Sequence, residues 1–257
     1  MAAKNAKATK SIRPEYRKNT PMTLDIIQLT DTHLCEEHPS RAEDLARCLA
    51  AIEAEAQRPE FLLHTGDITH NGLESEYRTA MEAIDASGIA CFVLPGNRDN
   101  RRIMLDFYSD RPYLPAGSQF FQYTIEEYDT RFIVLDTHSE HSNKGELCDL
   151  RFDLFEKMLS ADKTKPVTVV MHHPPFEVSE IPDPFQFVDW SQVERFEQII
   201  SSHKTVKQII CGHVHRNIDA EVSNRPVRVL TCLAGDLRKG EVTDSERKHP
   251  VYRWHKI

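Results

Sequence analysis

Five short polar motifs, most of them directly after apolar runs, constrain what this 257-residue chain can fold into. Four of the five follow a run with the length and composition of a buried strand. Parallel strands joined by crossovers end at one edge of a sheet, so side chains that follow them gather there. The motifs are Asp31-Thr32-His33, Gly66-Asp67, Gly96-Asn97-Arg98-Asp99, His172-His173 and Gly212-His213-Val214-His215.

The rest of the pattern predicts an α/β fold with two packed sheets. Strands alternate with helices in the first half, while the second half has more strands and fewer helices, which indicates a second sheet. Ser40 with Glu43, and Ser191 with Glu194, each fit a capping box at a helix start. The predicted strands are Leu24–Thr30, Phe61–Thr65, Ile89–Leu94, Phe120–Ile125, Phe132–Asp136, Val167–Met171, Val206–Cys211 and Val227–Leu233. The predicted helices are Ser40–Gln57, Glu74–Ser87, Phe152–Ser160 and Trp190–His203.

Composition favours a cytoplasmic protein over secreted or membrane classes. No apolar run approaches the roughly 20 residues that a membrane helix needs, and no apolar segment follows the early lysines as in a secretory signal. The six cysteines are dispersed without a CxxC pair, which fits buried, reduced thiols better than a disulfide framework. We therefore expect cytoplasmic localisation and no membrane span.

Charge divides the chain into two parts. Residues 1–20 carry six basic side chains and one acidic one, so the remainder is more acidic than the net charge of −8. We predict a disordered basic tail over residues 1–21 and a single domain over residues 22–257. An acidic body disfavours long nucleic acid as a partner and favours a small substrate.

The motif residues are the types that hold hard or borderline divalent metals. Asp31 and His33 are two positions apart, so in an extended chain their side chains would share a face. Asp67 could bridge two cations about 3.5–4 Å apart. Asn97 offers a neutral oxygen, and the preceding Gly96 allows a close backbone approach.

The histidine pairs leave alternatives open. Neighbouring residues on a strand point to opposite faces, so we expect only one of His172 and His173 to bind metal. The pair His213 and His215 could serve one metal or two neighbouring ones. Each motif alone has a structural interpretation as a turn, a helix cap or a surface histidine, but the combination indicates a two-metal phosphate ester hydrolase.

The ordered set resembles the calcineurin-like metallophosphoesterase superfamily, whose pattern is D-x-H, G-D, G-N-H-[DE], H and G-H-x-H. The resemblance covers roughly residues 23 to 235. The local sequence around several motifs is similar to that of the class III cyclic-nucleotide phosphodiesterase and glycerophosphodiesterase branch. These similar segments are residues 29–34 (LTDTHL), 65–72 (TGDITHNG), 135–137 (LDT), 145–147 (GEL) and 171–175 (MHHPP).

The resemblance implies a four-layered α/β/β/α sandwich with two mixed sheets and two metal positions sharing Asp67. One metal would be held by Asp31, His33, Asp67 and His215, and the other by Asp67, Asn97, His172 and His213. It also implies in-line attack on phosphorus by a metal-bound hydroxide. Iron and manganese rank first as cofactors, with zinc or cobalt as alternatives.

Arg98 departs from the family pattern, which has His at this position. Arginine cannot act as a general acid, but it can stabilise charge on a phosphate. We predict that Arg98, Asn97 and His173 take part in catalysis and substrate binding, with Arg98 as an electrostatic clamp. The alternative is that Arg98 pairs with Asp99. A replacement proton donor would be a metal-bound water or one of His70, His138, His141 and His173.

The leading functional hypothesis is a phosphodiesterase acting on a small diester, with a 3′,5′-cyclic nucleotide as the best guess. The alternative is hydrolysis of a glycerophosphodiester, a phospholipid headgroup or another phosphoester. A non-catalytic scaffold ranks below both, because all seven metal positions are retained. The C-terminal segment Val251–Ile257 fits either an extra strand or a dimer element, so a homodimer remains an option.

Overall fold

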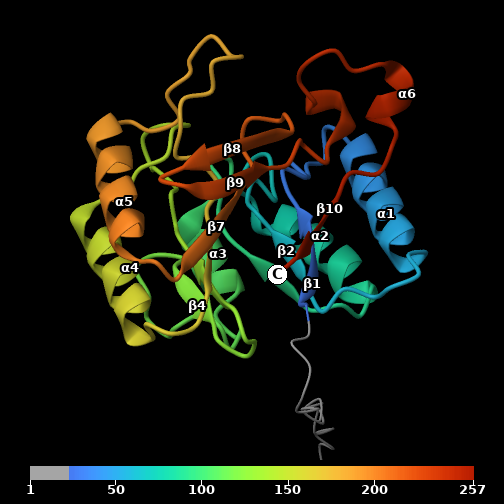
Figure 1. The fold of residues 1–257 in the computed structure, drawn as a ribbon. Helices are drawn as coiled ribbons and strands as arrows, with labels where there is room; N and C mark the ends of the chain where they lie inside the picture. Colours follow the sequence, from blue (N-terminus) through green and yellow to red (C-terminus); the bar gives the residue numbers. More distant parts are fainter. Residues whose placement is uncertain (1–22) are drawn as a thin grey trace, which may run out of the picture.

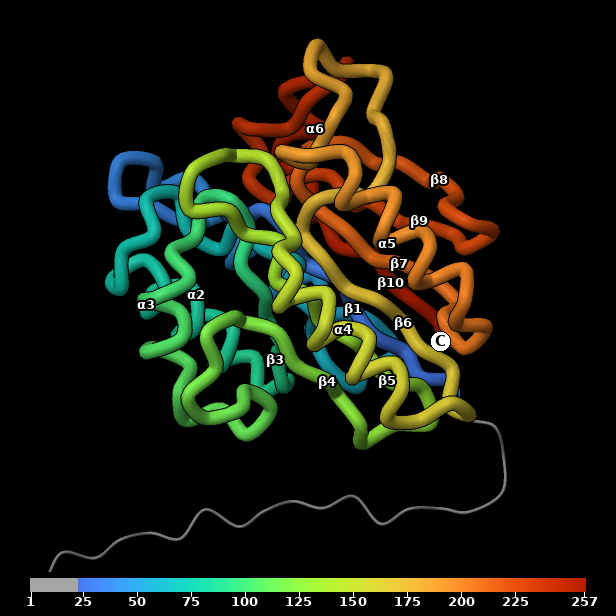
Figure 2. The backbone as a smooth tube through the Cα atoms, turned by 90° about the vertical axis from the view of Figure 1, so that its left-hand side faces the viewer, coloured from blue at the N-terminus to red at the C-terminus, as the bar shows by residue number. Residues whose placement is uncertain are grey.

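Two sheets pack face to face between two layers of helices (Figure 1). The computed structural model describes residues 23–257, and the predicted disordered tail over residues 1–21 lies outside them. Helices α1 (Ser40–Glu53), α2 (Glu74–Ala86) and α3 (Arg101–Phe107) contribute to the core of the first sheet. Helices α4 (Asp149–Ala161) and α5 (Trp190–Ser202) cover the outer face of the second sheet, nearest the viewer in Figure 2. The predicted four-layered α/β/β/α sandwich is confirmed.

The strand order places every motif after a parallel strand. The first sheet has the order β10-β1-β2-β3 and the second β4-β5-β6-β7-β9-β8. Strands β1, β2 and β3 are parallel to one another, as are β5, β6, β7 and β9. The strands are β1 Asp25–Leu29, β2 Leu62–His64, β3 Cys91–Val93, β4 Tyr123–Ile125, β5 Arg131–Val134, β6 Val167–Val170, β7 Val206–Cys211, β8 Ile218–Val222, β9 Arg225–Val229 and β10 Arg253–Lys256.

Strand β6 and the end of β7, at residues 209–211, are buried on both faces. Val170 and Ile210 belong to the core between the sheets, whereas their neighbours Val169 and Ile209 pack beneath α4 and α5. This alternation follows from the two-residue period of a strand, and it explains why these strands are continuous apolar runs. Each buried aliphatic side chain contributes about 1.5–3 kcal/mol.

The C-terminal segment is an extra strand. Residues 253–256 form β10, which pairs antiparallel with β1 at the edge of the first sheet. The short helices η1 (Gly235–Leu237) and α6 (Asp244–Arg247) precede it. The dimer alternative for this segment is untested and stays a prediction.

Four local features differ from the sequence prediction. Helix α3, which begins after Asn100, and strand β8 were not predicted. The Ser40 capping box is wrong, because α1 is preceded by a backbone turn at Pro39 and Ser40 is already helical. The Ser191 capping box is also wrong, since the side chain of Asp189 caps α5 by accepting from the Ser191 backbone N–H. Within residues 23–257 no helix is long and apolar enough to cross a membrane.

Candidate metal centre

The seven predicted metal ligands lie at one edge of the two sheets, on the loops that follow β1, β2, β3, β6 and β7. Each loop begins where a parallel strand ends, so the topology alone brings the loops together. The first sheet supplies Asp31, His33, Asp67 and Asn97, and the second supplies His172, His213 and His215. The structure therefore brings the predicted ligand residues together at a common sheet edge.

We call the first group the Asp31 half, formed by Asp31, His33, Asp67 Oδ2 and His215. Its ligand atoms all lie within 4.8 Å of one another. Asp31 Oδ1 is 3.3 Å from Nε2 of His215 and 3.7 Å from Nε2 of His33. Asp67 Oδ2 is 3.4 Å from the same His33 nitrogen. Ligands about 2.1 Å from a shared ion have mutual distances of this size.

The second group is the Asn97 half, formed by Asp67 Oδ1, Asn97, His172 and His213. Asn97 Oδ1 is 2.9 Å from Nδ1 of His213 and 3.3 Å from Nε2 of His172. Nε2 of His172 is also 3.6 Å from Asp67 Oδ1. The two oxygens of Asp67 therefore face different halves, which is the geometry of a bridging carboxylate.

The ring orientations suit metal binding. Nδ1 of His172 donates to the carbonyl oxygen of Thr65 at 2.7 Å, and Nδ1 of His215 donates to that of Leu237 at 3.0 Å. These bonds place a proton on Nδ1 of each ring, so in the neutral ring Nε2 is free and directed at the site. Burial alone would lower the pKa of His215, but its contact with Asp31 raises it, a contact that a bound cation would replace. Oδ1 of Asp31 is buried without a hydrogen-bond partner. Such an orphaned carboxylate oxygen among ring nitrogens fits a cation, so the residues present suit the predicted metals.

The electrostatics agree with this arrangement. Burial lowers the pKa of His172 and His213, which keeps these imidazoles neutral and able to act as ligands. Burial alone would raise the pKa of Asp31, but contacts with His215 and His33 hold it well below its usual range. The pKa of Asp67 is raised by burial and by the neighbouring Asp31 and Asp99 carboxylates. A divalent cation between the carboxylates would remove this repulsion.

The backbone of the ligand loops is strained. Five of the seven ligand residues have positive φ, with values of 53° at Asp31, 45° at His33, 51° at Asp67, 78° at His213 and 55° at His215. The left-handed conformation costs a non-glycine residue roughly 1–2 kcal/mol. The premise that residues 31–33 and 213–215 stay extended is therefore wrong, although the side chains do converge. Left-handed backbone, rather than a two-residue strand period, aims them at the site.

Two glycines leave room that no other residue could. A Cβ on Gly96 would lie 2.2 Å from Oδ1 of Asp67, and one on Gly212 would lie 2.1 Å from Oγ1 of Thr30. These clashes confirm the predicted close backbone approach at Gly96. They also explain why Gly precedes the ligand at both strand ends.

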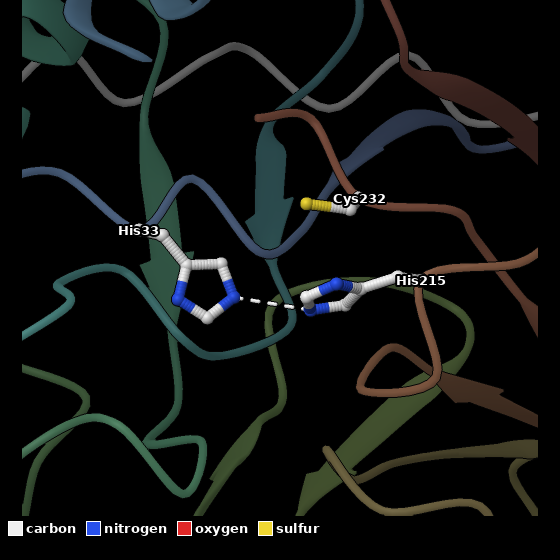
Figure 3. A group of neighbouring side chains, drawn as sticks. All are labelled: His33, His215 and Cys232. Carbon is white, nitrogen blue, oxygen red and sulfur yellow. Dashed lines mark hydrogen bonds between the residues drawn. The ribbon is translucent and has the colours of Figure 1, made fainter. Parts of the chain in front are cut away.

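Cys232 is a neighbour of the site that the sequence did not indicate. Its sulfur lies within 4.8 Å of the ligand nitrogens of His33 and His215 (Figure 3). The dashed line in Figure 3 joins the two Nε2 atoms, which are 3.1 Å apart. The thiol donates toward the carbonyl oxygens of Asp31 and Ala234, at 3.1 and 3.2 Å. Through these two hydrogen bonds Cys232 joins the Asp31 loop to the segment at Ala234.

Arg98 reaches a histidine instead of its neighbour Asp99. Its Nη2 lies 3.0 Å from Nε2 of His70, whose ring packs edge-on against His33 at 5.6 Å between centroids. Asp99 accepts from the backbone N–H groups of Ile68 and Thr69 and so organises the loop. The guanidinium of Arg98 therefore contacts His70 beside the Asp31 half, and the alternative pairing with Asp99 is not what the structure contains.

His173 is placed differently from the other motif histidines. Its Nδ1 lies 2.8 Å from Oγ1 of Thr137 and its Nε2 lies 3.2 Å from the carbonyl oxygen of Asn143. The side chain is fully buried, and burial beside His213 and His172 holds its pKa well below the usual range. Both ring nitrogens are occupied, so these contacts lend no support to a catalytic or substrate-binding role for His173, which stays a prediction.

Comparison with known proteins identifies the family. The family model described as calcineurin-like phosphoesterase matches residues 24–217. The chain belongs to this family. A probable glycerophosphodiester phosphodiesterase of Arcobacter nitrofigilis is 26% identical over 90% of this phosphoesterase and 87% of its own length. A 3′,5′-cyclic adenosine monophosphate phosphodiesterase of Vibrio vulnificus is 29% identical over 82% and 77%.

Solved structures agree on the fold. A dimetal phosphatase of Danio rerio superposes with a TM-score of 0.72, covering 92% of this phosphoesterase and 93% of that chain at 14% identity. The predicted family and its phosphodiesterase branch are confirmed, as is a metal-dependent phosphoric ester hydrolase.

Proposed function

We propose that this phosphoesterase hydrolyses a small phosphodiester, with a 3′,5′-cyclic nucleotide as the first candidate, at two divalent metals. The observation that carries the proposal is Asp67, whose two carboxylate oxygens face two separate groups of ligand residues. Relatives named as cyclic-nucleotide and glycerophosphodiester phosphodiesterases support a diester over a monoester. The acidic body, apart from residues 1–20, supports a small substrate over long nucleic acid.

The Asp31 half and the Asn97 half would each hold one ion, with Asp67 common to both. When bound, such ions polarise phosphoryl oxygens and lower the pKa of a water molecule. Mixed carboxylate, amide and imidazole ligation suits iron and manganese, and it also accepts zinc or cobalt.

Arg98 and His70 supply the remaining chemistry in this proposal. The guanidinium of Arg98 stabilises negative charge on the phosphate oxygens as the diester bond breaks. Because Arg98 donates to Nε2 of His70, the proton of a neutral His70 is on Nδ1. That Nδ1–H has no other hydrogen-bond partner in the structure, so in this proposal His70 donates a hydrogen bond to the leaving oxygen, and water supplies the proton, because a neutral imidazole does not give up its remaining proton.

A substrate panel tests the proposal. Protein supplied with Mn²⁺ is assayed against cyclic nucleotides, a glycerophosphodiester and simple aryl mono- and diesters. Preferential turnover of a cyclic nucleotide supports the first candidate, whereas faster turnover of the glycerophosphodiester replaces it with the alternative. Protein that binds no divalent metal and turns over none of these compounds would be a scaffold, and the proposed function would be wrong.

A further inference from the structure

The side chain of Gln28 is a buried polar group that the proposed chemistry does not use. Gln28 lies in β1 between Ile27 and Leu29 and is 0% exposed. Its amide nitrogen donates to Oγ1 of Thr65 at 2.9 Å and to the carbonyl oxygen of Cys211 at 2.8 Å. Both amide protons are therefore used, and a buried amide would be costly without such partners.

The two acceptors of Gln28 lie at the ends of strands in different sheets. Thr65 follows β2 in the first sheet and directly precedes Gly66-Asp67. Cys211 is the last residue of β7 in the second sheet and directly precedes Gly212-His213. One side chain thus joins the two sheets immediately before each delivers a ligand. The carbonyl of Thr65 also accepts from Nδ1 of His172.

The orientation of the Gln28 amide is fixed by a histidine in β10. Nε2 of His255, in β10, lies 3.0 Å from Oε1 of Gln28. Since Oε1 can only accept, His255 donates, and the amide nitrogen of Gln28 must point toward Thr65 and Cys211. His255 is itself buried, at 6% exposed. A continuous set of hydrogen bonds therefore runs from β10 to the strand ends beneath the metal site.

We propose that Gln28, oriented by His255, is a positioning residue that sets the spacing of the two sheets beneath the metal centre and so the separation of the two metals. The inference rests on the proposed dinuclear function. Each metal position takes ligands from both sheets, so a small relative shift of the sheets alters both positions at once. Partners behind metal ligands typically change metal affinity about 10–100-fold when removed.

The test compares Gln28→Met with Gln122→Met in the full-length protein. Gln122 is a matched control, because it is also buried and donates to a backbone carbonyl, that of Arg151, away from the ligands. Mn²⁺ binding is followed by calorimetry, and the magnetic coupling of the two bound Mn²⁺ ions by electron paramagnetic resonance. We expect Gln28→Met to weaken binding of at least one Mn²⁺ by about 10-fold or more and to change the coupling. Gln122→Met should leave both unchanged.

A second pair of variants tests the orienting role of His255. His255→Phe removes the donor to Gln28 and should change the coupling in the same direction as Gln28→Met. His255→Gln keeps an amide donor and should restore the wild-type coupling. If Gln28→Met does not fold, His255→Phe still tests whether Gln28 positions the metal centre, because this variant keeps the Gln28 amide and removes only the group that orients it.

The outcomes separate this inference from the proposed function. Wild-type metal affinity and coupling in Gln28→Met and His255→Phe, with only a fall in thermal stability, would make Gln28 a structural residue and overturn the inference alone. A wild-type protein that binds fewer than two Mn²⁺ ions would overturn the dinuclear function and this inference together.

Discussion

The two halves of the metal centre are built in different ways. In the Asp31 half all four ligand residues have left-handed backbone, whereas in the Asn97 half Asn97 and His172 do not. The Asp31 loop is held by buried side chains. Arg41 donates to the carbonyl of His33 at 3.2 Å, and Thr32 lies 3.0 Å from Nε2 of the fully buried His64. In the Asn97 half Asp67 and His213 are left-handed, and each sheet supplies two of the four ligand residues.

This difference shows two routes to a preorganised site. In the Asp31 half, packing around the loop offsets a strain of roughly 1–2 kcal/mol per left-handed residue. In the Asn97 half, the Thr65 carbonyl orients the ring of His172. The spacing of the sheets then determines how close Nε2 of this ring lies to Asn97, which the first sheet supplies. The first half should therefore be the more sensitive to changes in its own loop, and the second, with two ligand residues from each sheet, the more sensitive to a relative shift of the sheets.

The residue common to both halves should have the largest effect. Replacing Asp67 by Asn removes the bridging charge, and we expect loss of both metals with a fall in kcat of about 10³-fold or more. Metal analysis and steady-state kinetics check this. Asp44→Asn is the control, a buried carboxyl that accepts from the backbone N–H of Gly235 outside the ligand set. Loss of only one metal in Asp67→Asn would show that the halves are independent.

Arg98 links the halves, because its backbone follows Asn97 while its guanidinium contacts His70 beside His33. Arg98→Ala should lower kcat on a diester with a poor leaving group by about 10–100-fold, the effect of losing one charged donor at a transition state. Arg98→Lys should retain part of this rate. Unchanged turnover in Arg98→Ala would rule out the clamp.

Glycine substitutions in metal-free protein test the strain of the left-handed backbone at the ligand residues. His172→Gly removes a buried ring from ordinary backbone and should lower the free energy of unfolding by about 2–4 kcal/mol. His215→Gly also loses a ring but relieves a left-handed residue, so we expect a loss smaller by roughly 1–2 kcal/mol. Denaturant unfolding measures both. Equal losses would mean that the left-handed backbone stores no strain.

Folding stability should depend on pH through His255, which orients Gln28 beneath the metal site. Burial, with Arg253 and Arg228 nearby, lowers the pKa of His255 from 6.5 to about 4. The folded protein therefore binds fewer protons than the unfolded chain between these values, and stability falls as the pH drops from about 6.5 to 4, by at most roughly 3 kcal/mol for this group. His255→Gln should flatten the decline measured by thermal unfolding. An identical slope would contradict this assignment.

Much of the fold and site could be predicted because the ligands follow buried apolar runs. Asp31, Asp67 and Asn97 are polar residues at the ends of such runs, and parallel topology then brings them together. The division of ligands between two metals came from family resemblance, since spacing alone left His213 and His215 undecided. Left-handed backbone at Asp31 and His33 has no sequence signal, because glycine is the residue that normally marks it.

Other features were hidden because they depend on distant contacts. Gln28 is one polar residue in an apolar strand, and its partners are 37, 183 and 227 positions away. The approach of Cys232 to His33 and His215 is likewise set by tertiary structure. Helix α3 is short, with Asn100 as its capping residue, so a periodicity search passes over it.

The pairing of β1 with β10 has a consequence for synthesis of the protein. Residues 25–28 receive their antiparallel neighbours from residues 253–256, almost at the opposite end of the chain. In a nascent chain on the ribosome, this edge of β1 therefore stays unpaired until residues 253–256 have emerged. Closing so long a loop is slow, and the exposed edge is a site for mispairing during translation. Completion of the first sheet thus waits for residues 253–256.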